Sequence, residues 1–239
     1  ALSNRNLKLE THRACFSERA HVEPRTIREF LSRFRISSAL SIDTFLARNP
    51  AFDEVGKAAS AYVLFLHEHL DALHADDLEA SDRDNWYQYL VNTLARGDDW
   101  NAFDPCWLTI VTFNYDRSLE HYLQTSLCNM YGVAAERVRE RLQKLRIFHV
   151  YGDLGVDQFD QLPYGTPNRD NDRRHNAIQH AVKRLKIMKE GRDDNEALGP
   201  IRTAIQDSTN IAFLGFSFDK MNVDRLNYNE NFRSDSPPK

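Results

Sequence analysis

The chain has 239 residues, of which 41% are hydrophobic and 28% are charged, and its formal net charge is −4 at neutral pH. This size and composition suit one large α/β domain, or a core that carries a helical insertion. The sequence contains no run of about 20 apolar residues and no basic face, so neither a membrane nor a nucleic acid is indicated as a partner.

The three cysteines bear on the cellular compartment. Cys15, Cys106 and Cys128 lack the spacing of a metal site, and the last two sit among apolar residues. We therefore predict reduced thiols in the core, no bound metal and a cytoplasmic protein.

Helical patterns dominate the first hundred residues. The N-terminal segment, residues 1–35, shows no steady period over its first 24 residues. Beyond that point apolar residues recur with the 3.6-residue period of amphipathic helices, and Ser41 and Asp43 are suited to cap a helical turn. The predicted helices span 26–34, 44–48, 53–73 and 82–97.

Three later segments have the apolar character of buried strands, and each leads into polar or glycine-rich residues. The predicted strands span 107–113, 146–150 and 210–214. Helical patterns separate them, so the strands are expected to lie parallel, with their carboxyl ends along one edge of the sheet. Ligands of open α/β sheets bind at that edge. The sequence therefore predicts an α/β fold with a parallel sheet flanked by helices, and a ligand site where the strands end.

The first strand leads into Thr112, Asn114, Tyr115 and Asp116. A carboxamide at the end of a buried strand offers both a donor and an acceptor, so Asn114 is suited to hold a ribose hydroxyl or a water molecule. Asp116 could accept from ribose hydroxyls. The structural alternative is that Asp116 caps the following helix and that Asn114 is a turn residue.

The second strand carries His149 and leads into Tyr151 and Gly152. His149 and Tyr151 are two residues apart, which places them on the same face of an extended strand. An imidazole there could act as a general base or as a hydrogen-bond partner, and Gly152 would let the backbone bend closely around a ligand. The alternative is a core histidine bonded to a carbonyl group.

The third strand leads into Gly215 and Ser217, a small residue and a hydroxyl of the kind found where backbone amides approach a nucleotide. An ordinary turn between a strand and a helix explains the same residues.

The order of these motifs resembles the sirtuin-like NAD-hydrolase domains of bacterial anti-phage defence systems. The segments 41–46 and 85–87 look like the helical insertion of that family. The similarity covers residues 36–226, with the insertion at about 42–100, and leaves 227–239 as a flexible tail.

The resemblance implies a Rossmann-like parallel sheet and hydrolysis of the nicotinamide–ribose bond of NAD+, which gives ADP-ribose and nicotinamide and depletes NAD+ as a defence. The catalytic asparagine of the family maps onto Asn114. Its catalytic histidine stands directly before a glycine, where this chain has Tyr151, so we assign that role to His149 and add Asp116 as a third catalytic residue. The residues expected to line the nucleotide site are Thr112, Tyr115, Tyr151, Gly152, Gly215 and Ser217.

The resemblance also implies NAD+ as substrate with no further cofactor, and control by a homo-oligomer or by a defence-system partner. The family starts with a strand and a glycine-rich phosphate loop that have no counterpart before Ile36, so we expect weak NAD+ affinity. This departure favours the alternative of a catalytically weak sirtuin-like module that binds NAD+ or ADP-ribose or scaffolds an assembly.

Overall fold

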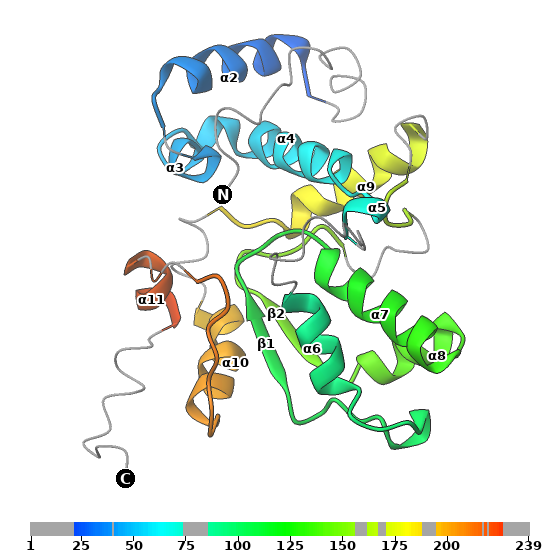
Figure 1. Ribbon diagram of the computed structural model, residues 1–239. Coiled ribbons are helices and arrows are strands. Elements are labelled where there is room, and N and C mark those ends of the chain that lie inside the picture. Colours follow the sequence, from blue (N-terminus) through cyan, green and yellow to red (C-terminus); the bar gives the residue numbers. More distant parts are fainter. Residues whose placement is uncertain are drawn as a thin grey trace, which may run out of the picture.

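The computed structural model describes residues 22–39, 41–73, 86–155, 162–166, 171–187, 195–216, 218 and 220–226. They form two parts, a helical unit and a sheet unit (Figure 1). The helical unit comprises α2 (Pro24–Ile36), α3 (Ile42–Leu46), the 3-10 turn η2 (Pro50–Phe52), α4 (Asp53–Leu66) and α9 (Asn171–Arg184). The sheet unit comprises α6 (Trp86–Leu94), the 3-10 turn η3 (Trp100–Ala102), β1 (Thr109–Thr112), α7 (Ser118–Tyr131), α8 (Ala135–Leu142), β2 (Arg146–His149), α10 (Asn195–Gln206) and α11 (Lys220–Leu226). The short helix α5 (Leu70–Leu73) follows α4.

The helical unit is organised around aromatic side chains. The rings of Phe30 on α2 and Phe45 on α3 lie 5.9 Å apart, in an edge-to-face contact, and both residues are fully buried. Ser41 caps α3, because its Oγ accepts from the backbone N–H of Thr44 at 3.2 Å. Gly56 lets α4 approach α3 closely, since a Cβ there would lie 2.5 Å from Leu46. The predicted helix at 26–34 and the capped turn after Ser41 are confirmed. The amphipathic character predicted for α4 is wrong, because every residue from 58 to 63 is buried and the helix is covered on nearly all sides.

The single helix predicted over 53–73 is wrong, because α4 ends at Leu66 and α5 starts at Leu70. Between them, Glu68 is buried and accepts two hydrogen bonds from Arg117 at the start of α7. A buried carboxylate needs such a partner, and the apolar period alone does not reveal it.

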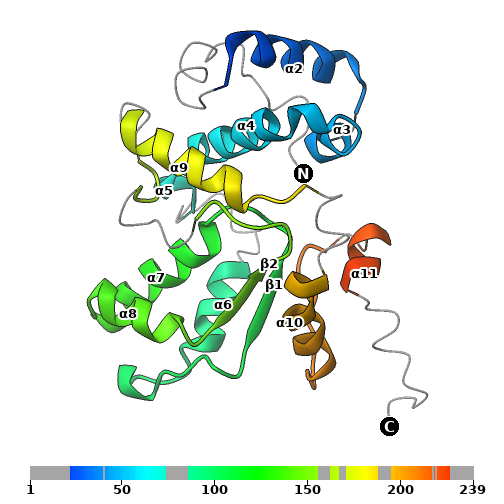
Figure 2. The same ribbon diagram turned by 180° about the vertical axis from the view of Figure 1, so that it is seen from behind.

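The two strands pair in parallel, and helices cover both faces of the pair. Thr109 lies opposite Arg146 and Thr112 opposite His149. In both ribbon views α6, α7 and α8 lie on one side of the strands and α10 on the other (Figures 1 and 2). Alternate side chains follow this division: Ile110 packs towards α7, whereas Val111 packs towards α10.

The predicted third strand at 210–214 is wrong, since the sheet in the described part of the chain is made of β1 and β2. The segment has no regular secondary structure, and Ile211 instead packs in the core formed with α10. Ile211 and Phe213 are partly buried, whereas Ala212 and Leu214 are exposed, so the apolar character of the segment does not mark a buried strand. The fold is therefore mostly helical, with a small two-stranded parallel sheet.

The carboxyl ends of both strands point towards the helical unit (Figure 1). The backbone N–H of Lys186, just after α9, donates to the carbonyl of Tyr151 at 2.9 Å. None of the described helices combines the length and apolar character needed to cross a membrane. Cys106 and Cys128 are free thiols, but Cys106 is exposed in the turn before β1, so the prediction that it is a core residue is wrong.

Candidate functional site

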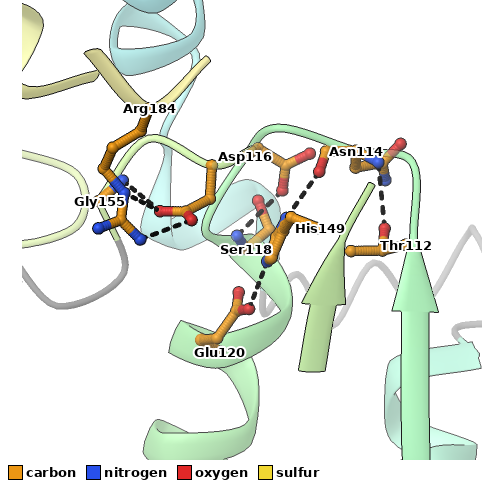
Figure 3. Close-up of polar contacts among 9 residues, drawn as sticks. Thr112, Asn114, Asp116, Ser118, Glu120, His149, Gly155 and Arg184 are labelled. Atoms are coloured by element: carbon orange, nitrogen blue, oxygen red, sulfur yellow. Dashed lines mark hydrogen bonds and ion pairs between the residues drawn. The ribbon is translucent and has the colours of Figure 1, made fainter. Parts of the chain in front are cut away.

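The predicted residues Asn114 and His149 come together at the carboxyl ends of β1 and β2 (Figure 3). Register explains this, since Thr112 at the end of β1 lies directly opposite His149. The chain then turns, and the backbone N–H of Asn114 donates to Thr112 Oγ1 at 3.1 Å. The parallel pairing therefore brings Asn114 and His149 to neighbouring positions at the strand ends.

The imidazole contacts the backbone of Asn114 rather than its carboxamide. His149 Nδ1 lies 2.7 Å from the carbonyl oxygen of Asn114, and His149 Nε2 lies 2.8 Å from Glu120 Oε1 on α7. The His149 side chain is only 6% exposed, whereas Asn114 is exposed. Figure 3 shows the Asn114 side chain directed away from the ring. His149 thus fixes the turn and leaves the carboxamide on the surface.

The surroundings of His149 favour its protonated form. A carbonyl oxygen only accepts, so Nδ1 donates to Asn114, and Nε2 faces a carboxylate. Burial lowers the pKa of His149, but the hydrogen bond and charge of Glu120, the Asn114 carbonyl and the charge of Asp153 outweigh it and raise the pKa above its ordinary value. With both ring nitrogens protonated, His149 and Glu120 form an ion pair.

Asp116 lies two residues before the first residue of α7. Its Oδ1 accepts from the backbone N–H of Ser118 at 3.0 Å, which satisfies one of the unpaired N–H groups of the first helical turn. The residue is partly exposed. The N-cap of α7 is Arg117, so Asp116 makes a local turn contact just before the helix, and its carboxylate also lies beside the candidate site (Figure 3).

Tyr151 lies away from His149, so the prediction that the two share a face is wrong. The strand ends at His149, and the chain turns before Tyr151, which ends the alternation of side chains. Tyr151 packs in the core on the α10 side, where its Oη donates to Asn222 Oδ1 at 2.5 Å. The guanidinium of Arg225 lies 4.6 Å from the centre of its ring.

Gly152 is required by packing rather than by a ligand. Its φ is +77°, and a Cβ there would lie 2.0 Å from the carbonyl oxygen of Arg184. The next residue, Asp153, is buried and accepts from Arg184 Nη2 at 2.7 Å. Burial raises the pKa of Asp153, but the hydrogen bond and charge of Arg184 outweigh it and lower the pKa below its ordinary value.

Gly215 lies in a turn that contacts the end of β1 through its neighbour. Gly215 has a φ of +61°, and the ring of Phe216 stacks on Phe113 with 5.3 Å between the centroids. Ser217, which was predicted to border the nucleotide, lies outside the described residues. In the part of the chain that the structure describes, no group of three or more His, Cys, Asp or Glu side chains is arranged to hold a metal ion.

Sequence reasoning missed Glu120, Asp153 and Arg184. Glu120 lies four residues after Asp116, one helical turn further along α7, and this spacing could have marked it as a partner for a side chain at the strand ends. Asp153 lies between a glycine and a leucine in the sequence. A carboxylate with such neighbours needs a cation as its partner. Nothing in the sequence pairs it with Arg184, which lies 31 residues further along the chain.

Comparisons of the chain with protein-family models, with curated proteins and with solved structures find no match.

Proposed function

We propose that the protein is an NAD+ glycohydrolase, which cleaves the nicotinamide–ribose bond to give ADP-ribose and nicotinamide, on a sirtuin-like, Rossmann-like fold. Its place would be that of an effector that depletes NAD+ in anti-phage defence. The supporting observation is the turn after β1, where His149 holds the backbone of Asn114 and the carboxamide remains exposed. The ends of parallel strands are where ligands of α/β folds bind.

The reaction needs orientation and charge stabilisation more than acid catalysis. Water adds to the anomeric carbon of the ribose, the bond to nicotinamide breaks with its electron pair going to the ring, and one proton is released. The transition state carries positive charge on the ribose, as in glycoside hydrolysis. A protein accelerates such a step by orienting the sugar and the water and by placing negative charge near the ring.

The side chains at the strand ends fit these needs. The Asn114 carboxamide would orient a ribose hydroxyl or the attacking water, and the Asp116 carboxylate would lie near the developing positive charge. The imidazolium form of His149 has no free lone pair with which to act as a base. It would hold Asn114 in place, and its pairing with Glu120 keeps the buried unit neutral beside a cationic transition state.

Thr112 and Tyr115, on either side of Asn114, would border the nucleotide through their backbone, and Gly215 and Ser217 would border it from the segment after residue 214. Tyr151 and Gly152 are held by contacts within the core, so they are not assigned to the nucleotide site. Unrestrained NAD+ hydrolysis would harm the cell that makes the enzyme, so we further propose that a homo-oligomer or a defence-system partner controls it.

The experiment that tests the proposal is to incubate the purified chain with NAD+ and to follow nicotinamide release. Replacing Asn114 with Ala should lower kcat by about 100-fold or more, as loss of one preorganised polar group does in other enzymes. Asn129 on α7 is the matched control, because its carboxamide is exposed and donates to the carbonyl of Thr125 in its own helix. An Asn114→Ala variant as active as wild type would refute the role of Asn114.

A second candidate is a module that binds NAD+ or ADP-ribose without turnover. The observation in its favour is that both ring nitrogens of His149 are bonded within the protein. Calorimetric titration with NAD+ and with ADP-ribose separates the two functions. Binding without nicotinamide release supports the module.

A further inference from the structure

Tyr115 connects the helical unit to both strand ends. Its phenol Oη donates to Asp43 Oδ1 on α3 at 2.9 Å, across 72 positions of sequence. Its backbone carbonyl accepts from the N–H of Leu154, in the turn after β2, at 3.0 Å. Its ring lies 6.1 Å from that of Tyr151. One residue in the candidate turn is therefore held at three points by segments distant in sequence.

Asp43 offers a fixed acceptor for this phenol. The residue is 7% exposed, and its neighbours Ile42 and Phe45 are buried in the core of the helical unit. Burial, followed by the charge of Asp43, raises the pKa of Tyr115 well above its ordinary value, so the phenol keeps its proton and remains a donor. A hydrogen bond between a buried carboxylate and a neutral phenol is among the stronger side-chain contacts.

The contact between Tyr115 and Asp43 affects the candidate site because Tyr115 lies between two of its residues. Asn114 precedes it and Asp116 follows it, so a shift of the Tyr115 backbone changes the orientation of both neighbours through their shared peptide groups. His149 and Thr112 fix the backbone of Asn114 from the strand side. The phenol of Tyr115 is the contact that fixes the turn from the side of the helical unit.

We infer that Asp43 is a positioning residue for the candidate site: by holding the Tyr115 phenol, it fixes the turn that presents Asn114 and Asp116. The inference rests on the proposed NAD+ hydrolysis and adds to it a contribution from α3. The sequence offered Asp43 as a capping residue, but Ser41 caps α3, and the Asp43 carboxylate instead accepts from Tyr115.

Kinetics of four variants test this role. Tyr115→Phe removes only the donor, Asp43→Ala removes the acceptor, and the double variant removes both. Each single change should lower kcat by about tenfold and change KM by less than about twofold, because the lost contact orients the site without binding substrate directly. The double variant should be no less active than the less active of the two single variants, because both changes break the same hydrogen bond. Asp43→Asn keeps an oxygen acceptor and should recover most of the activity that Asp43→Ala loses.

Tyr131→Phe is the matched control. The Tyr131 hydroxyl donates to the carbonyl of Gly97 at 2.8 Å, at the opposite end of α7 from the site. Tyr131→Phe also removes a tyrosine hydroxyl, but kcat should stay at the wild-type value. Equal kcat values for Tyr115→Phe and Tyr131→Phe, or losses that add in the double variant, would overturn the inference.

A readout without NAD+ separates this inference from the proposed function. The backbone amide resonances of Asn114 and Asp116 should move in the same direction in Tyr115→Phe and in Asp43→Ala, and should not move in Tyr131→Phe. Such shifts in a protein that releases no nicotinamide would refute the hydrolase and support the positioning contact. Unmoved resonances would overturn the positioning contact whatever the activity.

Discussion

His149 Nε2 lies 2.8 Å from Glu120 Oε1, which joins the end of β2 to the first turn of α7. The two side chains are 6% and 15% exposed, so water screens their charges little. Together with the bond from His149 Nδ1 to Asn114, this contact makes the imidazole the link between α7 and the candidate turn. The contact also ties the stability of the site to pH.

We expect the His149–Glu120 contact to stabilise the protein most at mildly acidic pH. The folded-state pKa of His149 is raised above its unfolded value of about 6.5. Its contribution is therefore complete below about pH 6.5 and is lost as the pH rises through the folded-state pKa. Glu120→Gln should reduce the free energy of unfolding by about 1–3 kcal/mol near pH 6 and by less near pH 9.

Denaturant unfolding at the two pH values measures this difference. Glu136→Gln is the control, because Glu136 pairs with Arg139 on the exposed surface of α8 and should have little effect at either pH. A loss for Glu120→Gln that is equal at both pH values would show that the His149 charge is not involved.

Asp153 and Arg184 should give the opposite pH dependence. The folded-state pKa of Asp153 is lowered, so its contribution is present above the unfolded value of about 3.9 and is lost as the pH falls through the folded-state pKa. Arg184 is 35% exposed, and solvent screening reduces the expected loss for Asp153→Asn to roughly 1 kcal/mol at pH 7. Thermal unfolding at pH 7 and at pH 3 tests this, and a larger loss at the lower pH would contradict it.

Local patterns predicted the elements of this fold better than their pairing. The capping at Ser41 is encoded within a few residues, so the capped start of α3 was predicted correctly. The segment 210–214 has a strand-like composition, but Ile211 packs against the core with α10 while Leu214 is exposed. Composition does not specify whether a neighbouring strand is present, and the third strand was predicted wrongly for that reason.

At the candidate site, too, local sequence patterns predict less than the full arrangement of the residues. Parallel pairing of two apolar segments predicted that Asn114 and His149 would meet. The directions of their side chains depend on Glu120 and on the residue at which β2 ends. Neither follows from the two-residue alternation of side chains along a strand. Tyr151 lies past that end, so it joins Asn222 and Arg225 in another core instead of joining His149.

The buried ion pair between Glu68 and Arg117 should be sensitive to loss of one partner. Arg117 is fully buried, donates to Glu68 at 2.6 and 2.8 Å, and also donates to the carbonyl of Leu162 at 3.0 Å. Arg117→Met leaves the carboxylate without its cation, and we expect a loss of about 3–5 kcal/mol at pH 8. Burial raises the pKa of Glu68 despite these bonds, so the loss should shrink at pH 5, where the unpaired carboxyl group takes up a proton.

Denaturant unfolding of Arg117→Met at both pH values checks this, together with a Glu68→Leu and Arg117→Met double variant. Because the double variant buries no unpaired charge, it should be more stable than Arg117→Met at pH 8. A double variant that is less stable would show that the pair contributes net stability beyond the cost of burying its charges.

Gly152 is the position where a single methyl group should do most harm to the strand ends. Its φ of +77° disfavours any residue with a Cβ, and that atom would lie 2.0 Å from the carbonyl oxygen of Arg184, where the backbone must move to make room. We expect Gly152→Ala to lower the free energy of unfolding by about 2 kcal/mol or more, because strain and steric overlap add. Gly97→Ala is the matched control, since a Cβ there meets nothing within 4 Å, and its stability should remain near wild type. Equal unfolding midpoints for the two variants would mean that the turn after β2 can shift away from Arg184 at little cost.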